Sequence, residues 1–279
     1  MDKKDTFRTI ATQVAHGDMA FPTGAQVALK LRRSLDDPDC SVETASRLIQ
    51  AEPLLASRII AMANSVIYNR SGREISDVRL AIALLGFRTI RSLAMSLVTR
   101  QMAGKVGDEA HQKLVNRLWE HSAHVTSLAH AIARHVTHQD AETVLFAGII
   151  HEIGGFFMLS RAPYFPGLLD GDYTDWLEGG EIEVGRAVLS KLQVPESVAS
   201  AIETFWEGYL SMPPVTLADT LLLAEMLSTI PSPLHHLEND ESAEMTVANI
   251  EMVIGEETLS QILTESSEEI DSLTKALQF

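Results

Sequence analysis

Cysteine is nearly absent from the sequence: Cys40 is the single one among 279 residues, so no internal disulfide can form. Such usage is typical of a reducing compartment. Aromatic residues make up only 6% of the chain, which disfavours an all-β sandwich, where aromatic and β-branched side chains are abundant. The first residues, MDKKDTFRTI, lack the apolar centre of a signal peptide. We therefore expect a cytoplasmic protein.

Long hydrophobic runs are also missing. The richest stretch, residues 144–159, is interrupted by His151 and Glu152, whereas a membrane-spanning helix needs about 20 predominantly apolar residues. We therefore expect no membrane association. With 46% hydrophobic residues, a chain of this length can still bury a substantial core in one large domain or two average ones.

Basic residues become scarce after residue 105. Residues 1–105 hold 15 Lys and Arg against 10 Asp and Glu, residues 106–279 hold 7 against 28, and the net charge is −16. An acidic surface repels the phosphates of nucleic acids and anionic lipids. The composition therefore disfavours a nucleic-acid partner and leaves protein partners as the expected ones. The oligomeric state stays open.

Apolar residues recur at intervals of three and four along nearly the whole chain, which is the period of an α-helix. Gly86 is placed to end one helix, and Gly104 marks a break where the charge balance also changes sign. A long helix is expected over residues 108–135, followed by an apolar helix over 141–153 that ends at the glycine pair 154–155. We identify no credible strand, so the sequence predicts an all-α fold.

These breaks predict four parts of the chain. They are an N-terminal segment (1–20), a first helical lobe (21–105), a second helical lobe (106–230) and a C-terminal tail (231–279). From Glu238 onward the tail carries 11 acidic residues and one basic residue, Lys275. Its apolar residues fall on one helical face, so we expect a helical tail that packs on the domain.

Several short segments together resemble the bacterial HDOD domain. The sequence reads EPLL at 52–55, ANS at 63–65 and AIALLG at 81–86, and the resemblance continues through LWEHS at 118–122 and LFAGIIHEIG at 145–154. It covers about residues 21–230. The resemblance implies a multi-helical relative of the HD-type metal-dependent phosphohydrolases, found in bacterial signalling and regulatory proteins and usually without the full catalytic set.

The resemblance also implies candidate metal ligands. HD phosphohydrolases hold one or two divalent ions through a His on one helix, an adjacent His-Asp pair on another and a distant Asp. The matching positions are His121, His151 with Glu152, and Asp219. Such ligands suit a divalent ion that activates water and screens phosphate charge. Glu152 stands where the family has Asp, and its extra methylene moves the carboxylate outward by about 1.5 Å, which weakens metal binding.

Further departures reduce the expected metal content. Gly155 stands where active relatives often carry Lys, and Glu181 stands where a His commonly occurs. The histidines that supply a second metal are replaced by Phe205 and Trp206, which cannot ligate a hard cation. We therefore expect at most one divalent ion, weakly held, no required cofactor, and no dinuclear phosphodiesterase.

Each candidate residue also has a purely structural interpretation. His121 and His124 lie three residues apart on one helix face, so they could form a metal pair or could be core histidines bonded to carbonyl groups. Asp219 could cap a helix rather than ligate a metal. The histidines at 235–236 fall in a proline-containing loop and are expected to face solvent.

A helix-turn-helix is a rival interpretation of the sequence around Gly86, where Arg79, Arg88 and Arg91 lie close together. A recognition helix must present polar side chains to base edges. Here the second helix uses its apolar face for packing, and the net charge is strongly negative, so DNA binding is disfavoured.

We therefore predict a non-catalytic HDOD-type regulatory module that acts through protein partners. Charge reversal of Arg88 and Arg91 is expected to weaken such an interaction. The alternative is a metal-dependent phosphohydrolase of the HD superfamily with a degenerate mononuclear site at His121, His151, Glu152 and Asp219.

Overall fold

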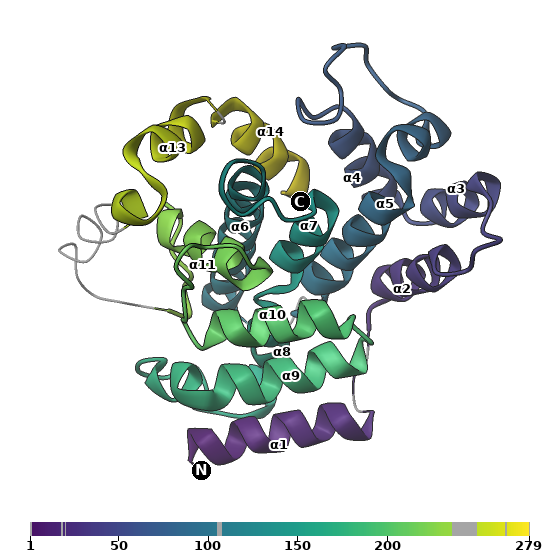
Figure 1. The fold of residues 1–279 in the computed structure, drawn as a ribbon. Coiled ribbons are helices and arrows are strands. Elements are labelled where there is room, and N and C mark those ends of the chain that lie inside the picture. Colours follow the sequence, from purple (N-terminus) through teal and green to yellow (C-terminus); the bar gives the residue numbers. More distant parts are fainter. Residues whose placement is uncertain are drawn as a thin grey trace.

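The computed structural model describes residues 2–17, 19, 21–104, 108–235, 250–265 and 267–278. Within these ranges every regular element is a helix (Figure 1), which confirms the all-α prediction. The helices form two groups, which meet along the second half of the long helix α5 (Val78–Met102).

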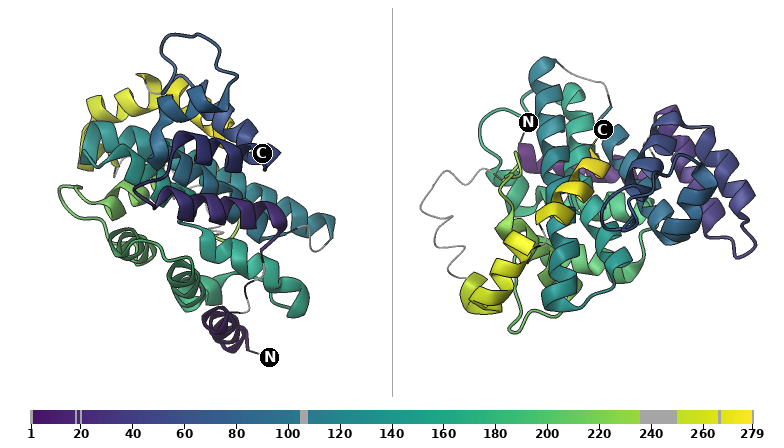
Figure 2. Two further views of the ribbon diagram at one scale, coloured as in Figure 1. Left: turned by 90° about the vertical axis from the view of Figure 1, so that its right-hand side faces the viewer. Right: turned by 90° about the horizontal axis from the view of Figure 1, so that it is seen from above.

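Four helices form the first group. They are α2 (Thr23–Leu35), α3 (Val42–Gln50), α4 (Pro53–Ala63) and α5 (Val78–Met102), and α2, α3 and α4 all pack against α5. Gly86 interrupts α5 with a left-handed φ of 75°, a conformation that glycine adopts without steric cost. The sequence predicted a helix end at Gly86, but the structure shows a kink there between the two halves of α5. Figure 2 shows this group on one side of the molecule.

Six helices build the second group. They are α6 (Glu109–Ile132), α7 (Ala141–Ile150), α8 (Ile153–Arg161), α9 (Glu181–Lys191), α10 (Glu196–Trp206) and α11 (Leu217–Leu227). Three shorter helices accompany them, namely η1 (Ala133–Thr137), η2 (Ala162–Tyr164) and η3 (Trp176–Gly180). Helix α6 packs against α7 and α11, while α8 packs against α9. The two groups are joined because α5 also contacts α7 and α8.

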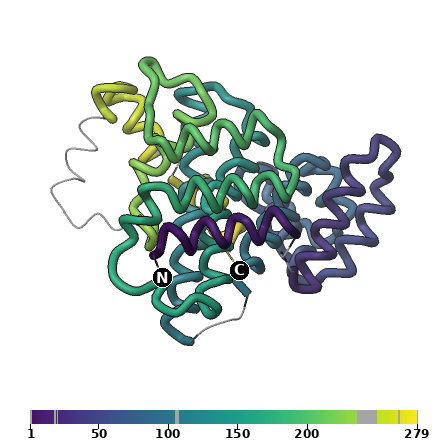
Figure 3. Tube along the Cα trace, turned by 90° about the horizontal axis from the view of Figure 1, so that it is seen from below, coloured from purple at the N-terminus to yellow at the C-terminus, as the bar shows by residue number. Residues whose placement is uncertain are grey.

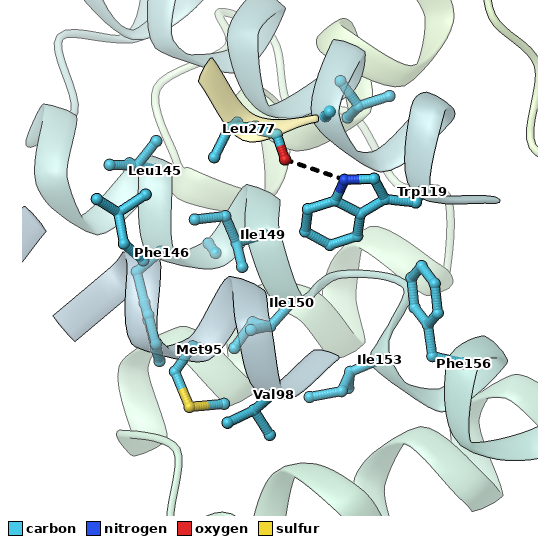
Figure 4. Close-up of a cluster of buried hydrophobic side chains, with 14 of the residues drawn as sticks. Met95, Val98, Trp119, Leu145, Phe146, Ile149, Ile150, Ile153, Phe156 and Leu277 are labelled. Carbon is cyan, nitrogen blue, oxygen red and sulfur yellow. Dashed lines mark hydrogen bonds between the residues drawn. The ribbon is translucent and has the colours of Figure 1, made fainter. Parts of the chain in front are cut away.

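Both ends of the chain pack on parts that are distant in sequence. Helix α1 (Lys3–His16) lies beside α9, as Figures 1 and 3 show. After α13 (Glu256–Ser260) and η4 (Gln261–Glu265), helix α14 (Ser267–Leu277) contacts both α6 and α4. The indole of Trp119 donates a hydrogen bond to the carbonyl of Leu277 at 3.0 Å (Figure 4). The C-terminal helix therefore bridges the two groups.

The glycine pair 154–155 does not end a helix, contrary to the sequence prediction. Helix α7 ends at Ile150, the chain turns at His151 and Glu152, and both glycines lie inside α8. A Cβ on Gly154 would come within 2.9 Å of the Gly185 Cα on α9. The glycine is needed for close approach of the two helices, and the turn occurs where the two polar residues lie.

The apolar core lies where α5, α6, α7 and α8 meet. Figure 4 shows Trp119, Ile149, Ile153 and Phe156 in this cluster, and all four are at most 3% exposed. Residues 78–102 and 141–164 are long and apolar enough to cross a membrane, but 67% and 83% of their apolar windows are buried in the protein. Most of both windows is therefore buried inside the protein, as in core helices.

Polar contacts also cross between the two groups. Arg88 on α5 pairs with Asp140, which precedes α7. Glu142 accepts hydrogen bonds from the Tyr68 hydroxyl at 3.0 Å and from the Thr89 hydroxyl at 2.6 Å. Basic and acidic residues of the two lobes therefore pair within the molecule.

Candidate metal centre

Two buried histidines face each other near the middle of the second group. His121 lies on α6, His151 lies at the turn after α7, both are 0% exposed, and their ring centroids are 5.6 Å apart. The Nδ1 atom of His121 lies 2.7 Å from the Ile230 carbonyl, and that of His151 lies 2.6 Å from the Gly148 carbonyl. Because a carbonyl can only accept, each Nδ1 must carry a proton. The neutral ring of either residue therefore has its lone pair at Nε2, as metal-ligating histidines do.

Two carboxylates lie beside these nitrogens. The Nε2 atom of His121 is 3.7 Å from Oε1 of Glu152 and 3.1 Å from Oε2 of Glu225. Glu152 is 1% exposed and follows His151 directly, whereas Glu225 comes from the C-terminal half of α11. The Glu152 carboxylate is oriented by the Ser232 hydroxyl, which donates to Oε1 at 2.8 Å. Two imidazoles and two carboxylates thus converge from three parts of the chain.

A further acid and a further histidine adjoin this group. Nε2 of His235 lies 3.4 Å from Oε1 of Glu181 and 3.9 Å from Oε1 of Glu152. Its Nδ1 lies 4.0 Å from Oε1 of Glu225. His235 was expected to face solvent, but its side chain is only 20% exposed, because residues 228–235 fold back over the cluster. His236 lies outside the described residues.

The cluster is poorly satisfied by hydrogen bonds. Among the described residues, six buried atoms that face it lack an aligned hydrogen-bond partner: Nε2 of His121, His151 and His235, Oε2 of Glu152 and Glu225, and Oε1 of Glu181. Four of these atoms form two imidazole–carboxylate pairs, His121 with Glu225 at 3.1 Å and His235 with Glu181 at 3.4 Å. An unsatisfied buried polar atom costs about 1–3 kcal/mol, so a bound cation that all six atoms can face would stabilise the cluster. Imidazole nitrogens and carboxylate oxygens together suit a divalent transition metal such as Zn²⁺, Mn²⁺ or Fe²⁺. The donor set therefore fits the kind of ion that the resemblance implies.

Burial and the crowded charges perturb the acid–base behaviour of these groups. Burial, together with the neighbouring His121, lowers the pKa of His151 to about 4, which favours the neutral imidazole. Burial would raise the pKa of Glu225, but His121 and other nearby histidines bring it down to about 2. Burial raises the pKa of Glu152. Protons and a metal ion compete for such ligands, so binding should depend on pH.

His121 and His235 respond to the same carboxylates in the opposite direction. Burial alone would lower the pKa of both, but Glu225 raises that of His121, and Glu152 with Glu181 raises that of His235 to about 10. The carboxylates therefore attract positive charge into the cluster from whichever source is available.

The structure places Asp219 outside this cluster. Its carboxylate accepts hydrogen bonds from the backbone and hydroxyl of Ser211, from the backbone of Val215, and from the backbone and hydroxyl of Thr216, at 2.5–2.9 Å. Asp219 and Thr216 form a capping box at the start of α11. Burial would raise the pKa of Asp219, but the bonds from Ser211 and Thr216 lower it to about 2. Three of the four residues predicted from the sequence, His121, His151 and Glu152, lie together. The fourth, Asp219, does not join them, but Glu225 from the same helix, α11, does.

The aromatic pair at 205–206 supports His151 rather than a metal. The Phe205 ring lies edge-on to the His151 ring at a centroid distance of 5.5 Å. The Trp206 indole donates to the His151 carbonyl at 3.3 Å. These contacts hold the turn between α7 and α8 in place.

Residues 228–235, the covering segment, close the cluster from outside. Its contacts with His121 and Glu152 come from Ile230 and Ser232. Leu234 is 0% exposed and packs so tightly that a Cβ on Gly155 would come within 2.7 Å of its Cδ1. A larger residue at position 155, where active relatives often carry Lys, would therefore have to displace the Leu234 side chain.

Several solved structures share this fold. A Shewanella amazonensis SB2B protein named "Putative metal-dependent phosphohydrolase" matches with a TM-score of 0.74 and 20% identity over 99% of this chain and 100% of that one. A Geobacter sulfurreducens HDOD domain protein of unknown function gives 0.61 and 20% over 98% and 97%. A Marinobacter aquaeolei VT8 protein named "Putative signal transduction protein" gives 0.57 and 16% over 100% and 67%. At such identities these matches establish the fold alone.

The comparison with protein families is more specific. Curated proteins give no match to this chain. The model of the HDOD domain matches residues 21–170, which is more than half of the sequence and includes His121, His151 and Glu152. The chain belongs to the HDOD domain family.

Proposed function

We propose that this chain is a non-catalytic, cytoplasmic regulatory module of signal transduction that acts through protein partners. In this proposal His121, His151, Glu152 and Glu225 hold a divalent ion that stabilises the second helical group rather than activating a substrate. A bound ion would satisfy the buried lone pairs and supply positive charge to the two carboxylates.

One observation carries the non-catalytic part of the proposal: three of the four ligands are buried. His121 and His151 are 0% exposed and Glu152 is 1% exposed, whereas the Glu225 side chain is 21% exposed. Ile230 and Ser232 of the covering segment contact His121 and Glu152. Metal-assisted hydrolysis needs an open coordination position that a substrate can reach. A further acid, Glu181, lies next to the ligands and would repel a phosphate group.

A surface on the first helical group supports the partner-mediated part. Leu80 and Leu84 lie one turn apart on α5 and are 62% and 43% exposed. They line a groove together with Ile75, two arginines (Arg70 and Arg73) and one acid, Glu74. An apolar stripe beside two arginines suits a partner helix that carries leucines and acidic residues.

Arg88 and Arg91, whose charge reversal was expected to weaken a partner interaction, are engaged within the chain. Arg88 pairs with Asp140, and Arg91 lies 3.1 Å from Asp36 and donates to the Leu35 carbonyl. Their charge reversal would disturb internal contacts as well as any partner. Leu80→Glu combined with Leu84→Glu is the cleaner test: a partner captured by the wild type should be lost, and unchanged capture would contradict this surface.

The test of the non-catalytic proposal is phosphoester turnover. The purified protein is assayed with nucleotides, cyclic dinucleotides and generic phosphoesters in the presence of Mg²⁺, Mn²⁺ or Fe²⁺. We expect no turnover above about 1 s⁻¹, the lower end of ordinary enzymes. Faster turnover that disappears in His151→Ala would overturn the proposal.

That outcome would establish the second candidate, a metal-dependent phosphohydrolase with a mononuclear site. The observation in its favour is that backbone carbonyls bond to Nδ1 of both histidines, which leaves both Nε2 atoms available to a metal, and that donor atoms of His121, His151 and Glu152 lie within 4.8 Å of one another. Displacement of the covering segment would then have to precede catalysis. A variant with Ser232→Ala, which removes the hydrogen bond to Glu152, should in that case be faster than the wild type.

A further inference from the structure

Three side chains at the edge of the cluster have the spacing of metal ligands. Donor atoms of Glu152, Glu181 and His235 all lie within 4.8 Å of one another. Nε2 of His235 is 3.4 Å from Oε1 of Glu181. A tetrahedral ion with ligands at about 2.1 Å holds neighbouring donor atoms about 3.4 Å apart. The spacing is longer than a hydrogen bond and equal to that between two ligands of one ion.

These three side chains also form ion pairs with one another. Nε2 of His235 lies 3.4 Å from Oε1 of Glu181 and 3.9 Å from Oε1 of Glu152. Among the described residues, Oε1 of Glu181, Oε2 of Glu152 and Nε2 of His235 have no aligned hydrogen-bond partner. A divalent ion at this position would replace the imidazolium proton and supply positive charge to the two buried carboxylates.

Glu152 occupies the boundary between this group and the first one. Its Oε1 atom is 3.7 Å from Nε2 of His121 and 3.9 Å from Nε2 of His235. A carboxylate has two oxygens and about four lone-pair sites, so it can serve two cations. The Ser232 hydrogen bond to Oε1 holds it between the two histidines.

From this geometry we infer a second binding position for a divalent transition-metal ion, formed by Glu152, Glu181 and His235 and bridged by Glu152 to the first. The inference rests on the proposed metal centre at His121, His151, Glu152 and Glu225. It raises the expected content from the single ion that the sequence predicts to two ions per chain.

This position differs from the one that the family resemblance implies for a second metal. There the residues are Phe205 and Trp206, which support His151. Here Glu181 comes from the first turn of α9, and His235 comes from the covering segment. An ion at this position would tie the covering segment to α9 and keep the cluster closed.

Metal stoichiometry tests the inference directly. Full-length protein is stripped with a chelator, equilibrated with Mn²⁺ by dialysis, and analysed for metal per chain and by electron paramagnetic resonance. We expect two Mn²⁺ per chain and a spin-coupled signal, because one carboxylate bridges the ions. His235→Ala and the isosteric Glu181→Gln should each retain one ion and lose the coupling.

Glu178→Gln is the matched control, because Glu178 is an exposed acid three residues from Glu181 that pairs with Lys4 at 2.8 Å. It should keep two ions and the coupled signal. Saturation of the wild type at one ion would overturn the second position and leave the first intact. No bound ion would overturn both, and two coupled ions in folded His235→Ala would remove His235 from the site.

Discussion

The two acids of α11 lie six residues apart and have opposite environments. Asp219, at the first turn, accepts hydrogen bonds from Ser211, Val215 and Thr216, and its role is complete within the fold. Glu225, near the other end, places Oε2 3.1 Å from Nε2 of His121, and this oxygen accepts no aligned hydrogen bond. A carboxylate whose oxygens already accept several hydrogen bonds, as in Asp219, has a structural role. A carboxylate that accepts no aligned hydrogen bond and lies among imidazoles, as in Glu225, is a candidate metal ligand. Resemblance alone assigned the metal role to the first of the two.

The largest effect on metal binding is expected at His151, which belongs to the same ligand cluster as Glu225. His151→Ala should abolish binding of the first ion, since it removes one of four ligands from a buried site. Metal content after dialysis against a mild chelator measures this. His124→Ala is the control, because the His124 ring bonds to the Ser228 hydroxyl and lies outside the two ligand groups. Equal loss in both variants would contradict the assignment.

The next largest effect is expected on the free energy of unfolding when Asp219 is replaced. Asp219→Ala removes the acceptor of several buried donors and the capping box of α11. Unsatisfied donors and a lost cap cost about 1–3 kcal/mol, so we expect unfolding at lower urea concentration by about that free energy. Glu225→Ala removes one close contact, that with Nε2 of His121 at 3.1 Å, whereas Asp219→Ala removes the acceptor of five hydrogen bonds, so we expect the smaller loss of stability in Glu225→Ala. The reverse order would break the comparison.

A smaller effect should appear in the pH dependence of stability. The pKa of Asp219 is lowered to about 2 from an ordinary 3.8, so the folded state binds this proton less readily than the unfolded state. Its contribution is fully present above pH 4 and is lost as the pH falls toward 2. Urea unfolding between pH 4 and 2 should be less steep with pH in Asp219→Asn than in the wild type. Parallel curves would contradict the role of its hydrogen bonds.

The smallest effect is expected at the surface contact between the helical groups. Arg88 and Asp140 are 57% and 53% exposed, and such pairs contribute about 0–1 kcal/mol. Arg88→Ala should therefore change the free energy of unfolding by less than about 1 kcal/mol and leave metal content unchanged. A larger loss would show that this contact, rather than α5 and α14, joins the groups.

Sequence periodicity predicts the helical class because a 3.6-residue pattern is local. The sequence placed an interruption at Gly86 and predicted a helix end there, whereas the structure shows a kink inside α5. The sequence pattern misplaced the end of α7. The glycines at 154–155 lie where α9 and Leu234 approach the backbone of α8 closely, and these contacts exist only in the folded chain. His235 carried no local signal.

Glu225 did carry a signal in the sequence. It is the one charged residue after the first turn of the apolar segment LADTLLLAEML, and an acid on such a helix needs a buried partner. Its partner, His121, lies 104 positions earlier in the chain, so no short motif could connect them. The candidate site was therefore predictable at the matched motif positions and not where tertiary packing supplies the ligand.

The most direct test of the account compares the two acids of α11 in one titration. Co²⁺ is added to metal-free Glu225→Gln, Asp219→Asn and wild-type protein, and the visible absorption of the bound ion is followed. Glu225→Gln should weaken Co²⁺ binding at least tenfold with folding intact, and Asp219→Asn should bind as the wild type does. Weakened binding in folded Asp219→Asn with unchanged binding in Glu225→Gln would contradict the account.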